Sequence, residues 1–145
     1  MDLPIDILLV DDEREFAETL AARLEVRGHR VRVAFGGASA LDAIEEQAPD
    51  VLILDVLMPG VDGITVLKEV KRRAPLVEVI LLTGHSTVDM AVTGLKAGAF
   101  DFVEKPTPFE ELLAKLDAAN RRRTEHEERI RLAQAQRLTR RTGDV

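Results

Sequence analysis

One stretch decides the fold: Val51-Leu52-Ile53-Leu54-Asp55-Val56-Leu57-Met58-Pro59-Gly60-Val61-Asp62-Gly63. Its first four residues are branched and apolar without polar alternation, which predicts a strand buried on both faces, as in a parallel sheet. The strand ends at Asp55, and the Pro-Gly and Asp-Gly pairs that follow are typical of turns, so we assign Asp62 to a turn. A carboxylate therefore lies at the carboxyl end of a central strand, where open α/β sheets place their ligand sites.

Strand-like and helix-like segments alternate along the rest of the chain. The expected strands cover residues 5–10, 30–35, 51–54, 77–82 and 100–103, and the expected helices cover 16–26, 40–44, 64–70, 88–95 and a segment from 109 onward. This alternation predicts an α/β fold, a flavodoxin-like, doubly wound, five-stranded parallel sheet in the order 2-1-3-4-5 with five helices. Residues 30–35 alternate strictly between polar and apolar, which suits a strand at the edge of that sheet.

The composition excludes several classes of protein. The chain has 145 residues and no cysteine, which indicates one domain, no disulfide framework and a reducing, cytoplasmic environment. No signal peptide or membrane-spanning stretch is recognisable. Residues 1–120 carry a net charge of −10 and residues 121–145 carry +4. An acidic body without Trp or Tyr argues against direct binding of nucleic acid.

Polar residues gather where the expected strands end. Asp11 and Asp12 follow the first strand and Asp55 follows the third, while Thr83 and Lys105 follow the fourth and fifth. Two carboxylates about 5 Å apart repel by roughly 3 kcal/mol at an effective dielectric constant near 20, so the acids require either a bound cation or raised pKa values. Oxygen ligands without Cys or paired His favour Mg²⁺. With Mg²⁺ bound, Asp55 is the expected nucleophile for a phosphoryl group, whose oxygens Lys105 and Thr83 would contact.

Each of these residues also has a purely structural explanation. Asp12 with Glu15 fits a helix-capping pair, Thr83 fits a β-branched strand residue, and Lys105 fits a solvated surface lysine. Capping leaves Asp11 unexplained. We favour a functional site because all of these residues are expected at one edge of the sheet.

The motifs Asp11-Asp12, Asp55 to Gly63, Thr83-Gly84 and Lys105-Pro106 together resemble the receiver domain of bacterial two-component response regulators. The resemblance covers approximately residues 5–120, and the segment 83–102 is most similar to receivers of enhancer-binding transcriptional activators. We therefore expect a receiver domain at 1–120 and a C-terminal helical extension or linker at 121–145. The sequence has no phosphate loop or helix-turn-helix after Asn120, which fits either a stand-alone receiver or one cut from a longer regulator.

The resemblance implies a role for each site residue. Asp55 would accept a phosphoryl group from a histidine kinase or phosphotransfer protein. Asp12, Asp55 and the backbone carbonyl of Val56 would hold Mg²⁺, with Asp11 assisting through water. Thr83 and Phe102 would form a switch pair that alters the face made by the fourth helix, fifth strand and fifth helix. The Lys105-Pro106 peptide is expected to be cis.

Other functions remain open at this stage. The leading interpretation is a phosphorylation-dependent signalling switch that catalyses only its own phosphorylation and autodephosphorylation. An aspartyl-nucleophile phosphatase of related fold is the alternative, although Leu57 occupies the position where such enzymes use a second Asp. A binding-only pseudo-receiver and a flavodoxin fit the acid cluster less well. We also expect a weak homodimer, through the C-terminal helix or through the face made by the fourth helix, fifth strand and fifth helix. The sequence does not identify the kinase, the output partner or the phosphoryl lifetime.

Overall fold

The core of the protein is a five-stranded, wholly parallel sheet. The computed structural model describes residues 4–141, except for the side chains of Val61 and His85. The strand order is β2-β1-β3-β6-β7, which confirms the predicted flavodoxin-like order and places β2 at an edge. The strands are β1 (Asp6–Val10), β2 (Arg30–Ala34), β3 (Val51–Asp55), β6 (Glu78–Thr83) and β7 (Asp101–Glu104). All five residues of β3, the central strand, are buried, as its apolar sequence predicted.

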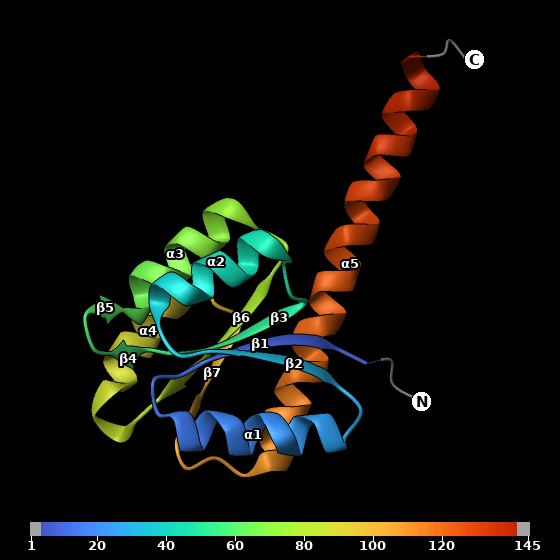
Figure 1. The fold of residues 1–145 in the computed structure, drawn as a ribbon. Coiled ribbons are helices and arrows are strands. Elements are labelled where there is room, and N and C mark those ends of the chain that lie inside the picture. The colour runs from blue at the N-terminus through green and yellow to red at the C-terminus, as the bar shows by residue number, and fades with distance from the viewer. Residues whose placement is uncertain (1–3, 142–145) are drawn as a thin grey trace.

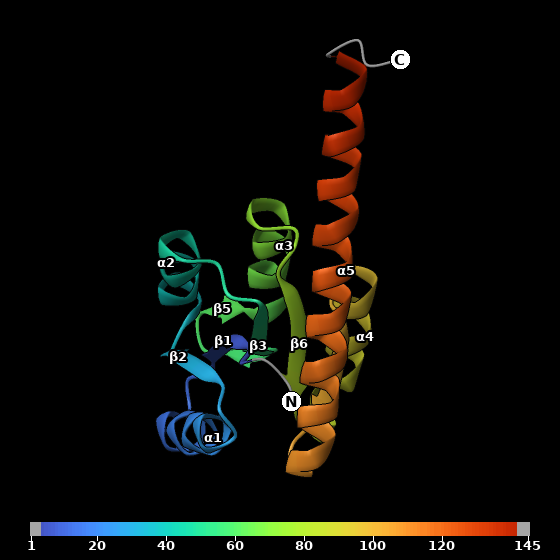
Figure 2. The same ribbon diagram turned by 90° about the vertical axis from the view of Figure 1, so that its right-hand side faces the viewer.

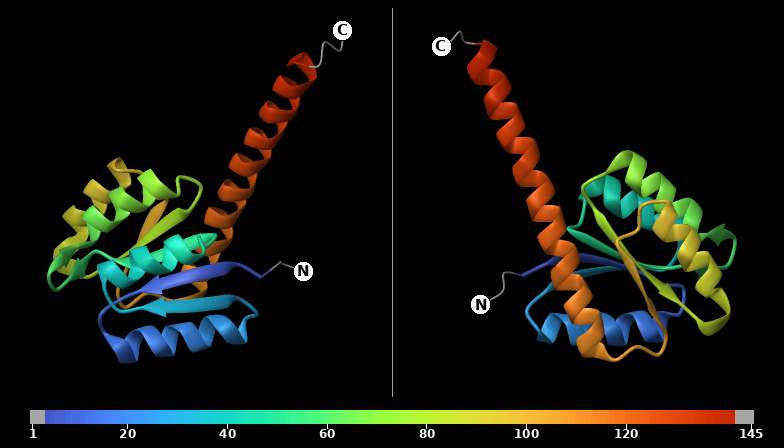
Figure 3. Two further views of the ribbon diagram at one scale, coloured as in Figure 1. Left: turned by 45° about the horizontal axis from the view of Figure 1, so that its top comes forward. Right: turned by 180° about the vertical axis from the view of Figure 1, so that it is seen from behind.

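Helices cover both faces of the sheet (Figure 1). The helices are α1 (Arg14–Val26), α2 (Gly37–Glu46), α3 (Gly63–Arg73), α4 (Val88–Lys96) and α5 (Phe109–Arg141). Helices α2, α3 and α4 pack on one face around Leu52 and Leu54, and α1 and α5 pack on the other around Val51 and Ile53. Figure 3 shows these two layers from two further directions. Because side chains of a strand alternate between faces, β3 contributes to both cores.

The stretch that follows β3 contains more structure than the sequence predicted. Residues Leu57–Met58 (β4) and Val61–Asp62 (β5) pair as a small antiparallel hairpin where only turns were expected. Gly60 has a φ of +78° at the tip of this hairpin, which explains the Pro-Gly pair. Asp62 lies at the end of β5 and caps α3, because its Oδ1 accepts a hydrogen bond of 2.9 Å from the backbone N–H of Ile64.

Helix α5 continues as one helix from Phe109 to Arg141. Its buried residues end at Ala119, and the remainder projects away from the body of the domain (Figure 2). At the point of departure, Arg122 lies 3.1 Å from Glu78 and Arg123 lies 3.3 Å from Asp50, two acids near the starts of β6 and β3. Within residues 4–141, none of the helices is apolar over a length that could cross a membrane.

Candidate phosphoryl-acceptor site

The candidate site lies at the carboxyl ends of the strands. At least one candidate side chain lies at or just after the end of each of four strands. Asp55 is the last residue of β3 and Thr83 is the last residue of β6. Asp11 and Asp12 directly follow β1, and Lys105 directly follows β7. Parallel strands bring these ends to the same side, which is why residues 94 positions apart meet here.

The three acids form one cluster. Asp11, Asp12 and Asp55 each offer a carboxylate oxygen, and these oxygens all lie within 4.8 Å of one another. Asp11 is completely buried and Asp55 is 6% exposed, while Asp12 is the member most accessible to solvent. Three converging carboxylate oxygens suit a hard divalent cation such as Mg²⁺.

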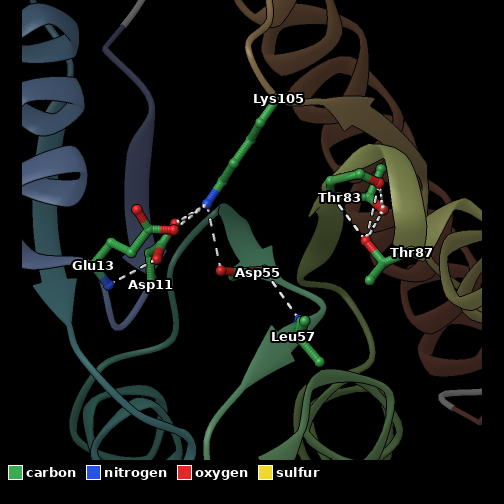
Figure 4. A network of polar contacts seen from close by, with 8 residues as sticks. Asp11, Glu13, Asp55, Leu57, Thr83, Thr87 and Lys105 are labelled. Carbon is green, nitrogen blue, oxygen red and sulfur yellow. Dashed lines mark hydrogen bonds and ion pairs between the residues drawn. The ribbon is translucent and has the colours of Figure 1, made fainter.

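Lys105 joins two of these acids (Figure 4). Its Nζ lies 2.7 Å from Asp11 Oδ2, 3.4 Å from Asp55 Oδ2 and 3.6 Å from Glu13 Oε1. Its ammonium also lies 4.3 Å from the centre of the Phe16 ring. The Lys105-Pro106 peptide is cis, as the sequence resemblance implied. Lys105 is therefore a partly buried cation paired with the acids of the site, and not a solvated surface lysine.

The charge balance of the site is incomplete with the lysine alone. The pKa of Asp55 is raised from 3.8 to about 6, mainly by burial and to a smaller extent by repulsion from Asp11. The backbone N–H of Leu57, which donates to Asp55 Oδ1 at 3.0 Å, and the Lys105 ammonium oppose the rise. Although burial alone would lower it, the pKa of Lys105 is raised by its ion pairs with Asp11 and Asp55. One ammonium does not compensate three acids, so an additional cation would find favourable electrostatics here.

The structural explanation for Asp12 is wrong. The N-cap residue of α1 is Glu13, and no side-chain capping bond is formed there among the residues that the structure describes. Instead Asp11 Oδ1 accepts from the backbone N–H of Glu13 at 3.0 Å, immediately before the helix. The local hydrogen bond before α1 is therefore made by Asp11, and the carboxylate of Asp12 lies in the acid cluster.

Thr83 and Phe102 do not contact the acid cluster in this structure. Thr83 is fully buried, and its Oγ1 lies 2.5 Å from Oγ1 of Thr87. Phe102 is half-buried on β7, and its carbonyl accepts from Lys115 Nζ at 2.6 Å. The sequence did not identify Thr87 and Lys115 as the partners of Thr83 and Phe102. The only signal for them was position, on the turn or helix next to the strand that carries the partner.

These elements define a class of protein: a doubly wound domain with an acidic cluster, an aspartate at the end of the central strand and a lysine after the last strand. The sequence matches the response regulator receiver domain family over residues 7–117, and the chain belongs to that family. This confirms the resemblance that the motifs indicated.

Individual relatives agree with this assignment. The chain is 40% identical over 122 residues to the response regulator MprA of Mycolicibacterium vanbaalenii, covering 84% of this chain and 53% of that protein. The crystal structure of the receiver domain of NtrX from Brucella abortus is 37% identical with a TM-score of 0.77, covering 80% of this chain and 98% of that one. A longer NtrX structure gives a TM-score of 0.84 at 35% identity, covering 90% of this chain and 30% of that one. The chain thus spans about half the length of the curated relatives it matches.

Proposed function

We propose that the chain is a phosphorylation-dependent switch that accepts a phosphoryl group on Asp55 from a histidine kinase or phosphotransfer protein. One observation carries this proposal: Asp55 ends the central strand with its carboxylate held by the Leu57 N–H and facing Lys105. A carboxylate fixed in this way is a competent covalent acceptor.

The proposed step is a phosphoryl transfer. A carboxylate oxygen of Asp55 forms a bond to phosphorus while the bond from phosphorus to the donor breaks, and the donor imidazole or carboxylate leaves with its electron pair. Lys105 lies 3.4 Å from Asp55 Oδ2 and would then pair with an oxygen of the transferred group. The breaking of its existing ion pair with Asp55 would be compensated by this new one.

The residues present fit Mg²⁺. Asp12 and Asp55 would bind the ion together with the backbone carbonyl of Val56, which accepts one hydrogen bond, from Gly63 at 3.2 Å, and so has a lone pair left. Asp11 already accepts from Glu13 N–H and from Lys105, which favours an indirect role through water. Bound Mg²⁺ would neutralise the acids and charge on the incoming phosphoryl oxygens.

The output of the proposed switch is the surface made by α4, β7 and α5. Thr83, at the end of β6, would donate its hydroxyl to the phosphoryl group, and the ring of Phe102 on β7 would turn inward. Phe102 packs against the core on the α4 side of the sheet, and Lys115 of α5 binds its carbonyl, so a movement of this residue would reach both neighbouring helices. Lys115 also pairs with Asp101 at 3.3 Å.

Signalling without turnover of an external substrate is part of this proposal. Leu57 is 61% exposed beside the site and supplies no acid that could protonate a leaving group. The cytoplasmic location remains a prediction from the cysteine-free composition, and the boundary at Asn120 remains a prediction from the sequence.

A weak homodimer is also proposed, through the projecting part of α5 or the α4–β7–α5 face. Ile130, Leu132 and Leu138 are each about half exposed or more on α5. Charged residues such as Arg123 and Arg137 interrupt the apolar heptad, which would keep any coiled coil weak. Sedimentation of the full chain with and without phosphorylation tests this, and a monomer at high micromolar concentration in both states would refute it.

The acceptor itself is tested with acetyl phosphate and Mg²⁺. Intact-mass spectrometry should show the gain of one phosphoryl group that neutral hydroxylamine removes, because an acyl phosphate is cleaved by this nucleophile and a Ser or Thr ester is not. Asp55→Asn should gain none, whereas Asp62→Asn, a matched change at a helix cap, should label like wild type. Hydroxylamine-sensitive labelling of Asp55→Asn would assign the acceptor role to another carboxylate.

A further inference from the structure

The hydroxyl of Thr83 is engaged by a second threonine. Thr87 is the last residue of the short 3₁₀ helix η1 (His85–Thr87) and directly precedes α4. Its Oγ1 lies 2.5 Å from Oγ1 of Thr83, and both side chains are buried, at 7% and 0% exposure. Nothing in the sequence motif requires a hydroxyl at position 87, so this contact needs its own explanation.

All hydrogens of the pair have acceptors inside one small cluster. Thr87 Oγ1 accepts from the backbone N–H of Gly84 at 2.9 Å. The carbonyl of Gly84 lies within hydrogen-bond distance of both hydroxyls, at 3.0 Å from Thr83 and 3.1 Å from Thr87. Whichever hydroxyl donates across the 2.5 Å contact, the other can donate to this carbonyl. The Thr83 hydroxyl is thus fully hydrogen-bonded on its own side of the site.

This cluster is separate from the acid network. In Figure 4 a dashed contact joins Thr83 to Thr87, while those of Asp55 run to Leu57 and Lys105. To donate to a phosphoryl group on Asp55, the Thr83 hydroxyl has to give up the hydrogen bond that it now donates, to Thr87 or to the Gly84 carbonyl. The exchange replaces one buried hydrogen bond by another, and only the second depends on phosphorylation.

We propose that Thr87 is a positioning residue that holds the Thr83 hydroxyl away from Asp55 until a phosphoryl group competes for it. This inference rests on the proposed function, since the competing acceptor is the group on Asp55. The contact also joins the site to the start of α4: loss of the Thr83 bond leaves Thr87 bound only to Gly84, within its own turn. The first residue to respond outside the site is therefore the one that precedes α4, on the proposed output face.

We call the Thr83–Thr87 contact the latch. The effect of removing it follows from the free energy that one hydrogen bond contributes. A net hydrogen bond contributes about a factor of five to an equilibrium. Thr87→Val retains the β-branched shape but removes the Thr87 hydroxyl, leaving Thr83 with the Gly84 carbonyl alone, so the state that binds a phosphoryl group gains by about that factor. Thr87→Ser keeps the hydroxyl and serves as the matched control.

The test is a double-mutant cycle with beryllofluoride, a phosphoryl mimic, and Mg²⁺, using the full chain and NMR titration. Thr87→Val should bind about fivefold more tightly than wild type, and Thr87→Ser should stay within about twofold. Thr83→Ala should bind more weakly, and adding Thr87→Val to it should change nothing further, because the latch has lost its target. A purely structural role of Thr87 in its turn would instead give the same change in both backgrounds, which would overturn the proposal.

Two outcomes separate this inference from the function on which it rests. If wild type and Asp55→Asn both fail to bind beryllofluoride, the proposed function is wrong and the latch falls with it. If wild type binds but Thr87→Val binds equally or more weakly, only the latch is refuted. Should Thr87→Val not fold, Thr87→Ala, which also removes the hydroxyl, takes its place in the cycle: tighter binding than wild type only when Thr83 is present supports the proposal, and unchanged or weaker binding overturns it.

Discussion

Neutralising the acceptor should stabilise the metal-free protein at neutral pH. The change is Asp55→Asn, which keeps the shape of the side chain and an oxygen for the Leu57 N–H bond of 3.0 Å. In wild type the pKa of Asp55 is raised from 3.8 to about 6, mainly by burial. A carboxyl that resists ionisation in the folded state makes folding less favourable wherever the unfolded chain is ionised.

The sign and the window follow from linkage. Below about pH 4 the carboxyl is protonated in both states and its shift has no effect on the free energy of unfolding. Between about pH 4 and 6 the folded state binds more protons than the unfolded state, so stability falls as the pH rises. Above about pH 6 the whole cost remains, and a shift of about two units corresponds to about 3 kcal/mol. Solvent screens this electrostatic cost little, because the Asp55 side chain is only 9% exposed.

Urea unfolding in EDTA, followed by circular dichroism, measures this. At about pH 8 the Asn variant should be more stable by about 2–3 kcal/mol, and at about pH 4 the gap should close. Mg²⁺ at 100 times its Kd should return about 2.7 kcal/mol to wild type only, because a ligand that binds the folded state stabilises it. Asp62→Asn, an exposed cap whose replacement is an equally good cap, should stay within about 0.5 kcal/mol at both pH values. An Asn variant that is no more stable than wild type in EDTA at pH 8 would refute the argument.

Three further changes test the site and its support. Lys105→Met should cost about 2–4 kcal/mol in EDTA, since it leaves two buried acids without their cation, and Mg²⁺ should recover part of this; equal loss with and without Mg²⁺ would speak against a shared site. Gly63→Ala should lower the free energy of unfolding by about 2 kcal/mol or more and slow labelling by acetyl phosphate, because the new Cβ would lie 2.6 Å from the carbonyl oxygen of Asp55. Gly36→Ala is the control, because its Cβ would lie 3.9 Å from the Ser39 hydroxyl; an equal loss of stability in both variants would refute the steric reason. Glu78→Gln should lower stability by about 1–3 kcal/mol in thermal or urea unfolding, because this buried carboxylate pairs with Lys71 and Arg122; an unchanged midpoint would show that the pairs contribute nothing.

The sequence predicted the fold, and the placement of the candidate site residues at one end of the sheet, for a definite physical reason. Each strand had an apolar run with a clear end, and in a parallel sheet those ends meet at one edge whatever the packing details. That rule alone was sufficient to expect Asp55 and Lys105 near each other. The close ion pairs of Lys105 confirm that placement.

Contacts set by the local path of the backbone could not be predicted in the same way. Asp11 and Asp12 are neighbours in sequence, and only the direction of the chain after β1 decides that Asp11 binds the Glu13 N–H. The Thr83–Thr87 contact depends on a single 3₁₀ turn after β6, which bends position 87 back toward the strand end. Both depend on local backbone geometry that periodicity does not specify.

The amino ends of the strands, opposite the site, show how α5 is joined to the rest of the domain. Asp50 accepts a hydrogen bond of 3.0 Å from the backbone N–H of Asp6, so the starts of β1 and β3 are joined there. Arg123 pairs with the same Asp50, and Arg122 pairs with Glu78 at the start of β6. The family match ends at residue 117, and the expected boundary falls at Asn120, yet the residues that tie α5 to three strands come just after it. Two ion pairs therefore tie the turn of α5 after Asn120 to the starts of β3 and β6, and we expect the folded unit to extend at least to Arg123.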